Sequence, residues 1–213
     1  MTFVTTRPIK QVCWRSLLRK FNFSILKVIL PIYIYGQPVL RKESVDIPKD
    51  YPQLDELVAN MFETLTASEG VGLAAPQIGL NIRVAVIDLD VLSEDLPEYK
   101  DFRKVYINPH ILEFDDSETE TMEEGCLSLP GIHESVTRAK RIRVKYEDAE
   151  RNEHEEWVDG YLARVMQHEF DHLDAHMFID RISPLRRQLI KNKLKALTLG
   201  KYRCSYRTKT VRR

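Results

Sequence analysis

A single seven-residue run limits the options for this chain more than any other feature. The run QHEFDHL at residues 167–173 places the pattern H-E-x-x-H inside a stretch whose apolar residues recur at helical spacing. On an α-helix, residues four apart lie on one face, so His168 and His172 can bind one metal ion together, with Glu169 close to the same ion. Two imidazole ligands and a carboxylate general base are the groups of metal-assisted hydrolysis. The pattern therefore predicts a metallohydrolase, and the third ligand decides which kind.

Length and charge predict one domain with two basic ends. At 213 residues and 43% hydrophobic content, the chain suits a single catalytic domain, which we place at residues 28–200. Residues 1–27 carry six Lys or Arg and no acid, residues 28–180 carry fourteen and all thirty-two acids, and residues 181–213 carry twelve and no acid. We therefore expect a basic N-terminal extension at 1–27 and a basic C-terminal tail at 201–213.

The N-terminal extension bears on where the protein works. It is basic and acid-free, loosely like an organelle transit peptide, but Arg15, Arg19 and Lys20 interrupt any secretory apolar segment and no small-residue cleavage site follows. We favour a disordered extension or a non-native start on a cytoplasmic protein, with organellar targeting as the alternative. Three cysteines are too few for a disulfide framework and fit a reducing compartment. No apolar run reaches the length of a membrane span, so we expect a soluble protein.

The spacing of apolar residues predicts an α+β fold, with strands in the middle of the chain and helices before and after them. We expect a helix over 50–67 capped by Asp50, the metal helix after Asp159, and a last helix from Ser183-Pro184 that Gly200 closes. Alternating patterns predict strands at 82–88, 105–107, 111–114 and 142–146, with 155–158 as a hairpin partner. Residues 28–40 suggest an extended arm, and the acidic stretch 113–124 suggests a solvated segment.

The third metal ligand is expected upstream of the metal helix. No Asp or Glu follows Asp180, which argues against a thermolysin-like site, and Ala175 and Phe178 stand where a metzincin needs Gly and His. A thiolate binds soft metals strongly, although a lone cysteine is more often a small buried hydrophobic residue. These residues alone leave four candidates in the body of the chain, namely Cys126, His110, His133 and His154.

Three motifs taken together resemble the signature motifs of the peptide deformylase family, bacterial type. They are GVGLAAPQ at 70–77, EGCLS at 124–128 and QHEFDH at 167–172, and they occur in this order. The resemblance covers residues 28–200. It implies an α+β fold in which small mixed or antiparallel sheets pack around a central metal-binding helix, with a further helix at the C-terminus. It also implies hydrolysis of the N-formyl group of the initiator formyl-methionine, with release of formate.

The resemblance assigns a role to each matching residue. Cys126, His168 and His172 would bind one divalent ion, Fe²⁺ in the cell, with Zn²⁺, Ni²⁺ or Co²⁺ as alternatives. Glu169 would act as the general base, and the Gln77 side-chain amide and Leu127 backbone N–H would stabilise the developing oxyanion. The backbone at Gly70, Val71, Gly72 and Gly125 would lie beside the substrate, where glycine permits close approach. Val71, Ile132 and the metal helix would form the methionine pocket.

Several neighbouring residues remain open to more than one interpretation. His133 could line the substrate cleft or lie at the surface, whereas His110 and His154 fit surface positions. Asp171 is expected to support the metal site through contacts with its ligands rather than to face solvent. These interpretations depend on packing, which the sequence pattern does not reveal.

The expected partners are formylated nascent peptides, with no membrane partner and no requirement for an oligomer. The family's C-terminal helix is associated with ribosome binding, and the last predicted helix here is rich in cations, namely Arg186, Arg187, Lys191, Lys193 and Lys195. The resemblance therefore leads to the hypothesis that this helix contacts ribosomal RNA.

Two rival functions are weighed against this one. A general metallopeptidase would keep the metal site and cleave an internal amide, but the missing downstream ligand and the Cys-Leu-Ser segment argue against it. A metal-stapled binding module would be closed by four protein ligands. The chain offers three strong ligands and a well-placed Glu169, which a structural site does not need.

Overall fold

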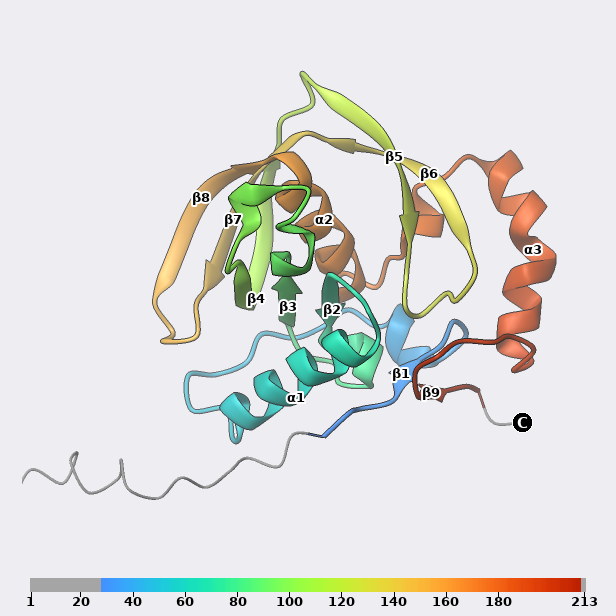
Figure 1. Ribbon diagram of the computed structural model, residues 1–213, viewed down its shortest axis with the longest axis horizontal. Helices are drawn as coiled ribbons and strands as arrows, with labels where there is room; N and C mark the ends of the chain where they lie inside the picture. Colours follow the sequence, from blue (N-terminus) through green and yellow to red (C-terminus); the bar gives the residue numbers. More distant parts are fainter. Residues whose placement is uncertain (1–27, 212–213) are drawn as a thin grey trace, which may run out of the picture.

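A five-stranded antiparallel sheet forms the body of the molecule (Figure 1). The computed structural model describes residues 28–211, so the predicted N-terminal extension at 1–27 and residues 212–213 lie outside it. The strand order is β2-β3-β4-β7-β8. The strands are β2 (Gly72–Ala74), β3 (Val84–Asp88), β4 (Arg103–Phe114), β7 (Arg141–Glu147) and β8 (Glu153–Asp159). Strand β2 lies at one edge of this sheet, so one side of its backbone has no strand of the sheet beside it.

The predicted strands at 105–107 and 111–114 are parts of one long strand, β4. Its pairing with β7 shifts register between Ile107 and His110, at the position of Pro109. Proline cannot donate to the ladder, so a bulge lets the strand continue past it. The predicted hairpin is present, with Val144 of β7 opposite Glu156 of β8.

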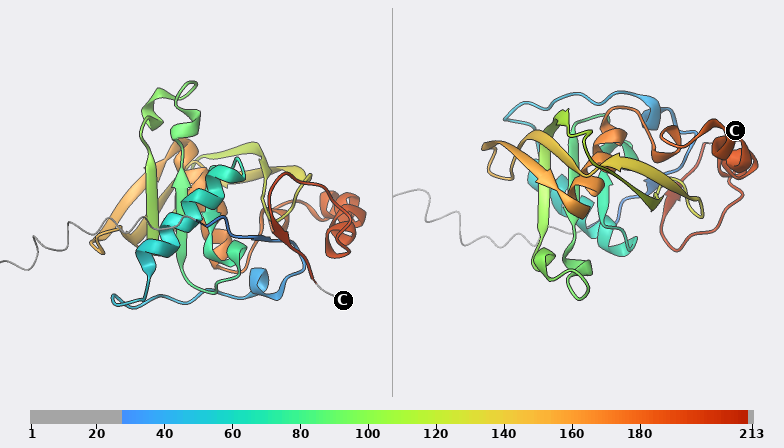
Figure 2. Two further views of the ribbon diagram at one scale, coloured as in Figure 1. Left: turned by 60° about the horizontal axis from the view of Figure 1, so that its bottom comes forward. Right: turned by 90° about the horizontal axis from the view of Figure 1, so that it is seen from above.

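Helix α2 (Gly160–Leu173) crosses the middle of the molecule and carries the H-E-x-x-H residues. Ten of its fourteen residues are buried, because α2 contacts the five-stranded sheet and also β6 (Figures 1 and 2). Met166, Phe170 and Leu173 join the sheet's Ile87, Ile142 and Val144 in one apolar cluster. The helix that carries His168 and His172 is therefore held from several sides. It begins after Asp159, as the sequence predicted.

The acidic stretch at 113–124 is exposed to solvent over most of its length, as the sequence predicted, with Glu124 as the buried exception. Its second half forms strand β5 (Thr119–Gly125), which pairs antiparallel with β6 (His133–Ala139) as a separate two-stranded ribbon. Most acidic side chains of β5 are exposed, but Glu124 is buried. Successive residues of a strand point to opposite faces. The composition of the stretch did not indicate which residue points inward, because the buried residue is a glutamate like its exposed neighbours.

Helix α1 (Leu54–Ala67) lies against β2 and β3. The predicted cap Asp50 was wrong, because the helix begins four residues later, after Gln53 in the left-handed conformation at φ 56°. Pro52 disfavours a helical conformation at the preceding residue, Tyr51, which would have been in the first turn.

The two ends of the described chain meet. Strand β1 (Ile32–Tyr33) pairs in parallel with β9 (Thr208–Lys209), within the stretch expected to be an extended arm. Helix α3 (Pro184–Thr198) precedes β9 and is capped by Ser183, whose side chain accepts a hydrogen bond from the Arg186 backbone. None of the helices in residues 28–211 has the length and apolar character needed to cross a membrane.

Candidate metal centre

Three side chains, two from α2 and one from the segment after β5, lie close together. Cys126 directly follows β5, and His168 and His172 lie one turn apart on α2. Their ligand atoms all lie within 4.8 Å of one another, and Cys126 Sγ is 3.2 Å from His172 Nε2. The structure thus brings together the three residues that the sequence motifs single out as metal ligands.

Glu124 sets the orientation of His168. Its Oε2 lies 2.9 Å from His168 Nδ1, so this nitrogen donates to the carboxylate and Nε2 is the nitrogen that would bind a metal ion. Burial alone would raise the pKa of Glu124, but hydrogen bonds from His168 and Arg138 outweigh burial and lower the pKa to about 2. Glu124 is therefore an anion at neutral pH, which fixes the tautomer of the histidine.

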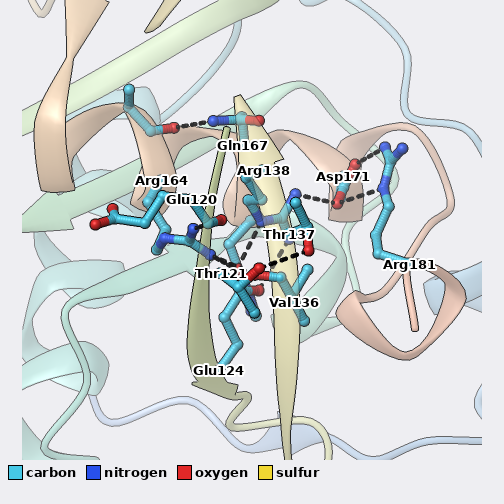
Figure 3. A network of polar contacts seen from close by, with 12 residues as sticks. Glu120, Thr121, Glu124, Val136, Thr137, Arg138, Arg164, Gln167, Asp171 and Arg181 are labelled. Atoms are coloured by element: carbon cyan, nitrogen blue, oxygen red, sulfur yellow. Dashed lines mark hydrogen bonds and ion pairs between the residues drawn. The ribbon is translucent and has the colours of Figure 1, made fainter. Parts of the chain in front are cut away.

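A buried ion-pair network holds Glu124 in place (Figure 3). Arg138 on β6 donates to both carboxylate oxygens of Glu124, at 2.6 and 2.9 Å, and to Asp171 on α2 at 2.9 Å. Arg164 donates to Glu124 at 2.8 Å, and Arg181 donates to Asp171 at 2.5 Å. The network ties the ribbon to α2, and hence the segment that carries Cys126 to the helix that carries the two histidines.

Most of this network was not predicted from the sequence. Asp171 was expected to support the metal site through its ligands, and it does reach His168 through Arg138 and Glu124. Arg138 and Arg164 were not singled out, although both are more than nine-tenths buried. The one indication in the sequence was Glu124, the first residue of the EGCLS motif. Once the strand places its carboxylate inside the protein, that carboxylate needs buried cationic partners.

The chemistry of these groups fits a divalent cation. Burial, together with the positive charge near it, lowers the pKa of His172 well below its usual value, which favours the neutral imidazole that ligates metals. At His168 burial acts the same way, but hydrogen bonds with Cys126 and Glu124 outweigh it and raise the pKa. The surroundings of His168 therefore stabilise positive charge, and a soft thiolate with two imidazoles suits Fe²⁺, Zn²⁺, Ni²⁺ or Co²⁺.

Glu169 lies beside this cluster with one face against β2. It is 4% exposed, and its Oε2 has no hydrogen-bond partner among residues 28–211. A Cβ atom on Gly72 would lie 2.7 Å from Glu169 Cδ, so glycine is needed for the carboxylate to reach its position. Burial raises the pKa of Glu169 to about 7.

Gln77 is held in one orientation within the 3-10 helix Ala75–Ile78. Its Oε1 accepts a hydrogen bond of 2.8 Å from the Ala74 backbone N–H. Its Nε2 consequently points toward the Cys-His-His group, 3.5 Å from Cys126 Sγ and 3.4 Å from Ser128 Oγ. The amide donor is thus fixed beside the cluster before any ligand binds.

An open cleft of about 470 Å³ leads to these groups. Its lining includes Gln77, Leu127, Glu169 and every glycine that the resemblance places beside the substrate, of which Gly72 belongs to the edge strand β2. His133 also lines the cleft, at its exposed rim. Ile132 does not line it and is buried in the core instead. His110 and His154 lie elsewhere at the surface, paired with Asp46 and Asp148.

Comparison with known proteins decides the family. The sequence profile of the polypeptide deformylase family matches residues 29–188. The peptide deformylase of Christiangramia forsetii is 44% identical over 187 residues, covering 84% of this chain and 95% of that protein. The crystal structure of peptide deformylase from Thermotoga maritima superposes with a TM-score of 0.66 at 44% identity, covering 74% of this chain and 99% of that one. The chain belongs to the peptide deformylase family.

Plant members of the family have the same architecture. Peptide deformylase 1B of Arabidopsis thaliana superposes with a TM-score of 0.71 at 30% identity, covering 80% of this chain and 91% of that one. The predicted α+β deformylase fold is confirmed, as are the predicted family and activity. This deformylase is a metal-dependent hydrolase that removes N-formyl groups from nascent peptides, and it has a Cys-His-His group able to hold a divalent ion.

Proposed function

We propose that this deformylase uses Cys126, His168 and His172 to hold one divalent ion, Fe²⁺ in the cell, and acts on formyl-methionine at the start of new chains in the cytoplasm. When bound, the ion supplies Lewis-acid polarisation of the formyl oxygen and of the attacking water. The single observation that carries the proposal is the convergence of one thiol and two imidazole groups within 4.8 Å at a cleft. A structural site would be closed by a fourth protein ligand.

Glu169 moves the proton. Its unpaired Oε2 and its place on the cleft wall put a carboxylate next to the position where water would attack. It accepts a proton from that water and returns it to the leaving amine, so that formate and a free N-terminus are released. Its burial keeps bulk water away and strengthens its interactions with neighbouring charges.

Gln77 and Leu127 stabilise the charge that develops on the formyl oxygen. The Gln77 amide is oriented beforehand by Ala74, and preorganised donors cost no rearrangement during reaction. The Leu127 backbone N–H follows Cys126 directly and lines the same cleft. Removing one such donor typically costs a factor on the order of 10²–10³ in rate.

The substrate backbone binds along Gly70, Val71 and Gly72 on one wall and near Gly125 on the other. The edge strand β2 allows the peptide to add as a further strand, held by main-chain hydrogen bonds. Main-chain recognition is independent of side-chain identity, which suits an enzyme that meets many sequences after methionine.

A formate-release assay tests this function most simply. Iron-loaded and zinc-loaded protein should release formate from a formyl-Met peptide and should leave an unblocked peptide of the same sequence intact. Glu169→Ala should keep its metal, measured by elemental analysis, and lose at least about 10²-fold in turnover. Near-wild-type turnover in this variant would contradict the general-base role, and cleavage of unblocked peptides would favour a general peptidase.

We further propose that α3 contacts ribosomal RNA. Arg186 pairs with Glu134 and Arg187 pairs with Asp180, whereas Lys191, Lys193 and Lys195 are exposed on a helix that buries only three residues. Reversing the three lysines to glutamate should abolish cosedimentation with ribosomes at low salt and leave formate release unchanged. Equal cosedimentation of this variant and the wild type would overturn the proposal. Binding by the wild type should also fall steeply as salt rises.

A further inference from the structure

The C-terminal segment at residues 201–209 returns to the active-site cleft. After α3 the chain runs back beside β1, where Ile32 N donates to Arg207 O at 2.9 Å and Ile34 N donates to Lys209 O at 3.0 Å (Figure 2). This pairing places Arg203, Cys204, Ser205 and Tyr206 on the cleft lining. The segment lies beyond residues 29–188, which the family profile matches.

Tyr206 makes a specific contact with the segment that follows the metal-binding cysteine. Its hydroxyl donates a 2.8 Å hydrogen bond to the backbone carbonyl of Leu127. Its ring is partly buried and packs against the main apolar core. The hydroxyl is therefore delivered to this carbonyl by a side chain that is itself held in place.

Three successive carbonyls in this segment each accept a hydrogen bond from a different donor. Cys126 O accepts from Leu129 N at 2.9 Å, and Ser128 O accepts from Tyr35 N at 2.9 Å. Leu127 O, between them, accepts from the Tyr206 hydroxyl. The donors to Cys126 O and Ser128 O are backbone N–H groups, whereas the donor to Leu127 O is the side chain of Tyr206.

We propose that Tyr206 is a positioning residue for deformylation, which helps to fix the backbone conformation at Leu127 so that the Leu127 N–H points at the developing oxyanion. The proposal rests on the role proposed above for Leu127. The Leu127 N–H lies in the same peptide plane as the Cys126 carbonyl, which Leu129 N holds, and the Leu127 carbonyl lies in the next plane, which Tyr206 holds. Holding both planes limits the φ and ψ rotations at the Leu127 Cα atom that joins them. Without the Tyr206 hydrogen bond only one of the two planes is held, so the direction of the N–H is less well fixed. A less well directed donor stabilises the transition state less, whereas substrate binding in the ground state is little affected.

Tyr206→Phe removes only the hydroxyl, and Tyr202→Phe is its matched control. The Tyr202 hydroxyl donates to Thr208 Oγ1 at 2.8 Å within the same segment, and within residues 28–211 this hydroxyl has no hydrogen bond to residues 126–129. We expect Tyr206→Phe to lower kcat about tenfold, equivalent to about 1.4 kcal/mol at 25 °C. Its KM, melting temperature and metal content should match those of Tyr202→Phe, whose kcat should equal that of the wild type.

The outcomes separate this inference from the function on which it rests. Equal kcat in wild type and Tyr206→Phe, with both active, would overturn the positioning role alone. An equal fall in both variants, or a rise in KM with unchanged kcat, would also overturn it, because the first indicates a general role of the segment and the second indicates direct substrate binding. Absence of formate release from metal-loaded wild type would instead refute the proposed function, and the inference with it.

Discussion

Replacing Gly72 by alanine should move the general base without destabilising the fold. The added Cβ would lie 2.7 Å from Glu169 Cδ and 2.8 Å from Cγ. Carbon atoms in contact normally lie about 3.5–4.0 Å apart, so the Glu169 carboxylate must shift by about 1 Å. Gly72 is not among the glycines with positive φ, so the backbone itself accepts alanine. A displacement of about 1 Å in a catalytic group costs on the order of 10²-fold in rate, which is the loss in kcat/KM that we expect.

The control for this variant is Gly200→Ala. Gly200 has a φ of 70°, and the nearest heavy atom to an added Cβ, in Thr210, is 4.0 Å away. Alanine there should lower the free energy of unfolding by roughly 1–2 kcal/mol because of the left-handed conformation, and should leave kcat unchanged. Gly72→Ala should instead lower the rate of formate release and leave the thermal unfolding transition unchanged. Turnover within threefold of wild type for Gly72→Ala would refute the close fit between Gly72 and Glu169.

Three further changes test the metal site and its surroundings. Cys126→Ala should strongly reduce the metal content found by elemental analysis, and unchanged content would exclude Cys126 as a ligand. Arg138→Met should lower the free energy of unfolding by about 3–5 kcal/mol in denaturant titrations, because two buried carboxylates lose their partner; a loss below about 1 kcal/mol would contradict the network. Partial burial would raise the pKa of Asp180, but its ion pairs with Arg41 and Arg187 help to lower it below the ordinary value of 3.8. These ion pairs therefore stabilise the fold above pH 3.8, and the stabilisation is lost as the pH falls through the lowered pKa. The stability difference between wild type and Asp180→Asn should therefore be largest at neutral pH and shrink below pH 4, whereas a constant difference would rule out the ionic contribution.

The sequence predicted those parts of the site that depend on local spacing. The four-residue spacing of His168 and His172 requires a helix, and α2 is present from Gly160 to Leu173. Ser183 followed by Pro184 marks the start of α3 because both residues act within one helical turn.

The parts that depend on contacts between distant segments could not be predicted. Arg138 meets Glu124 and Asp171 only after β5 and β6 pair and pack against α2, and no local pattern in the chain records that packing. Tyr206 is 79 residues from Leu127, and its contact depends on the parallel pairing of β1 with β9. Glu124 and its acidic neighbours have the same charge in the sequence, and only the pairing of the ribbon distinguishes the inward residue from the exposed ones.

The most direct test of the account is X-ray absorption spectroscopy of the iron-loaded and zinc-loaded enzyme. We expect one sulfur and two imidazole nitrogen ligands for each ion, with the sulfur signal absent in Cys126→Ala and one nitrogen lost in His172→Ala. A metal ion with no sulfur in its coordination shell would contradict the central claim that Cys126, His168 and His172 form a single catalytic metal site.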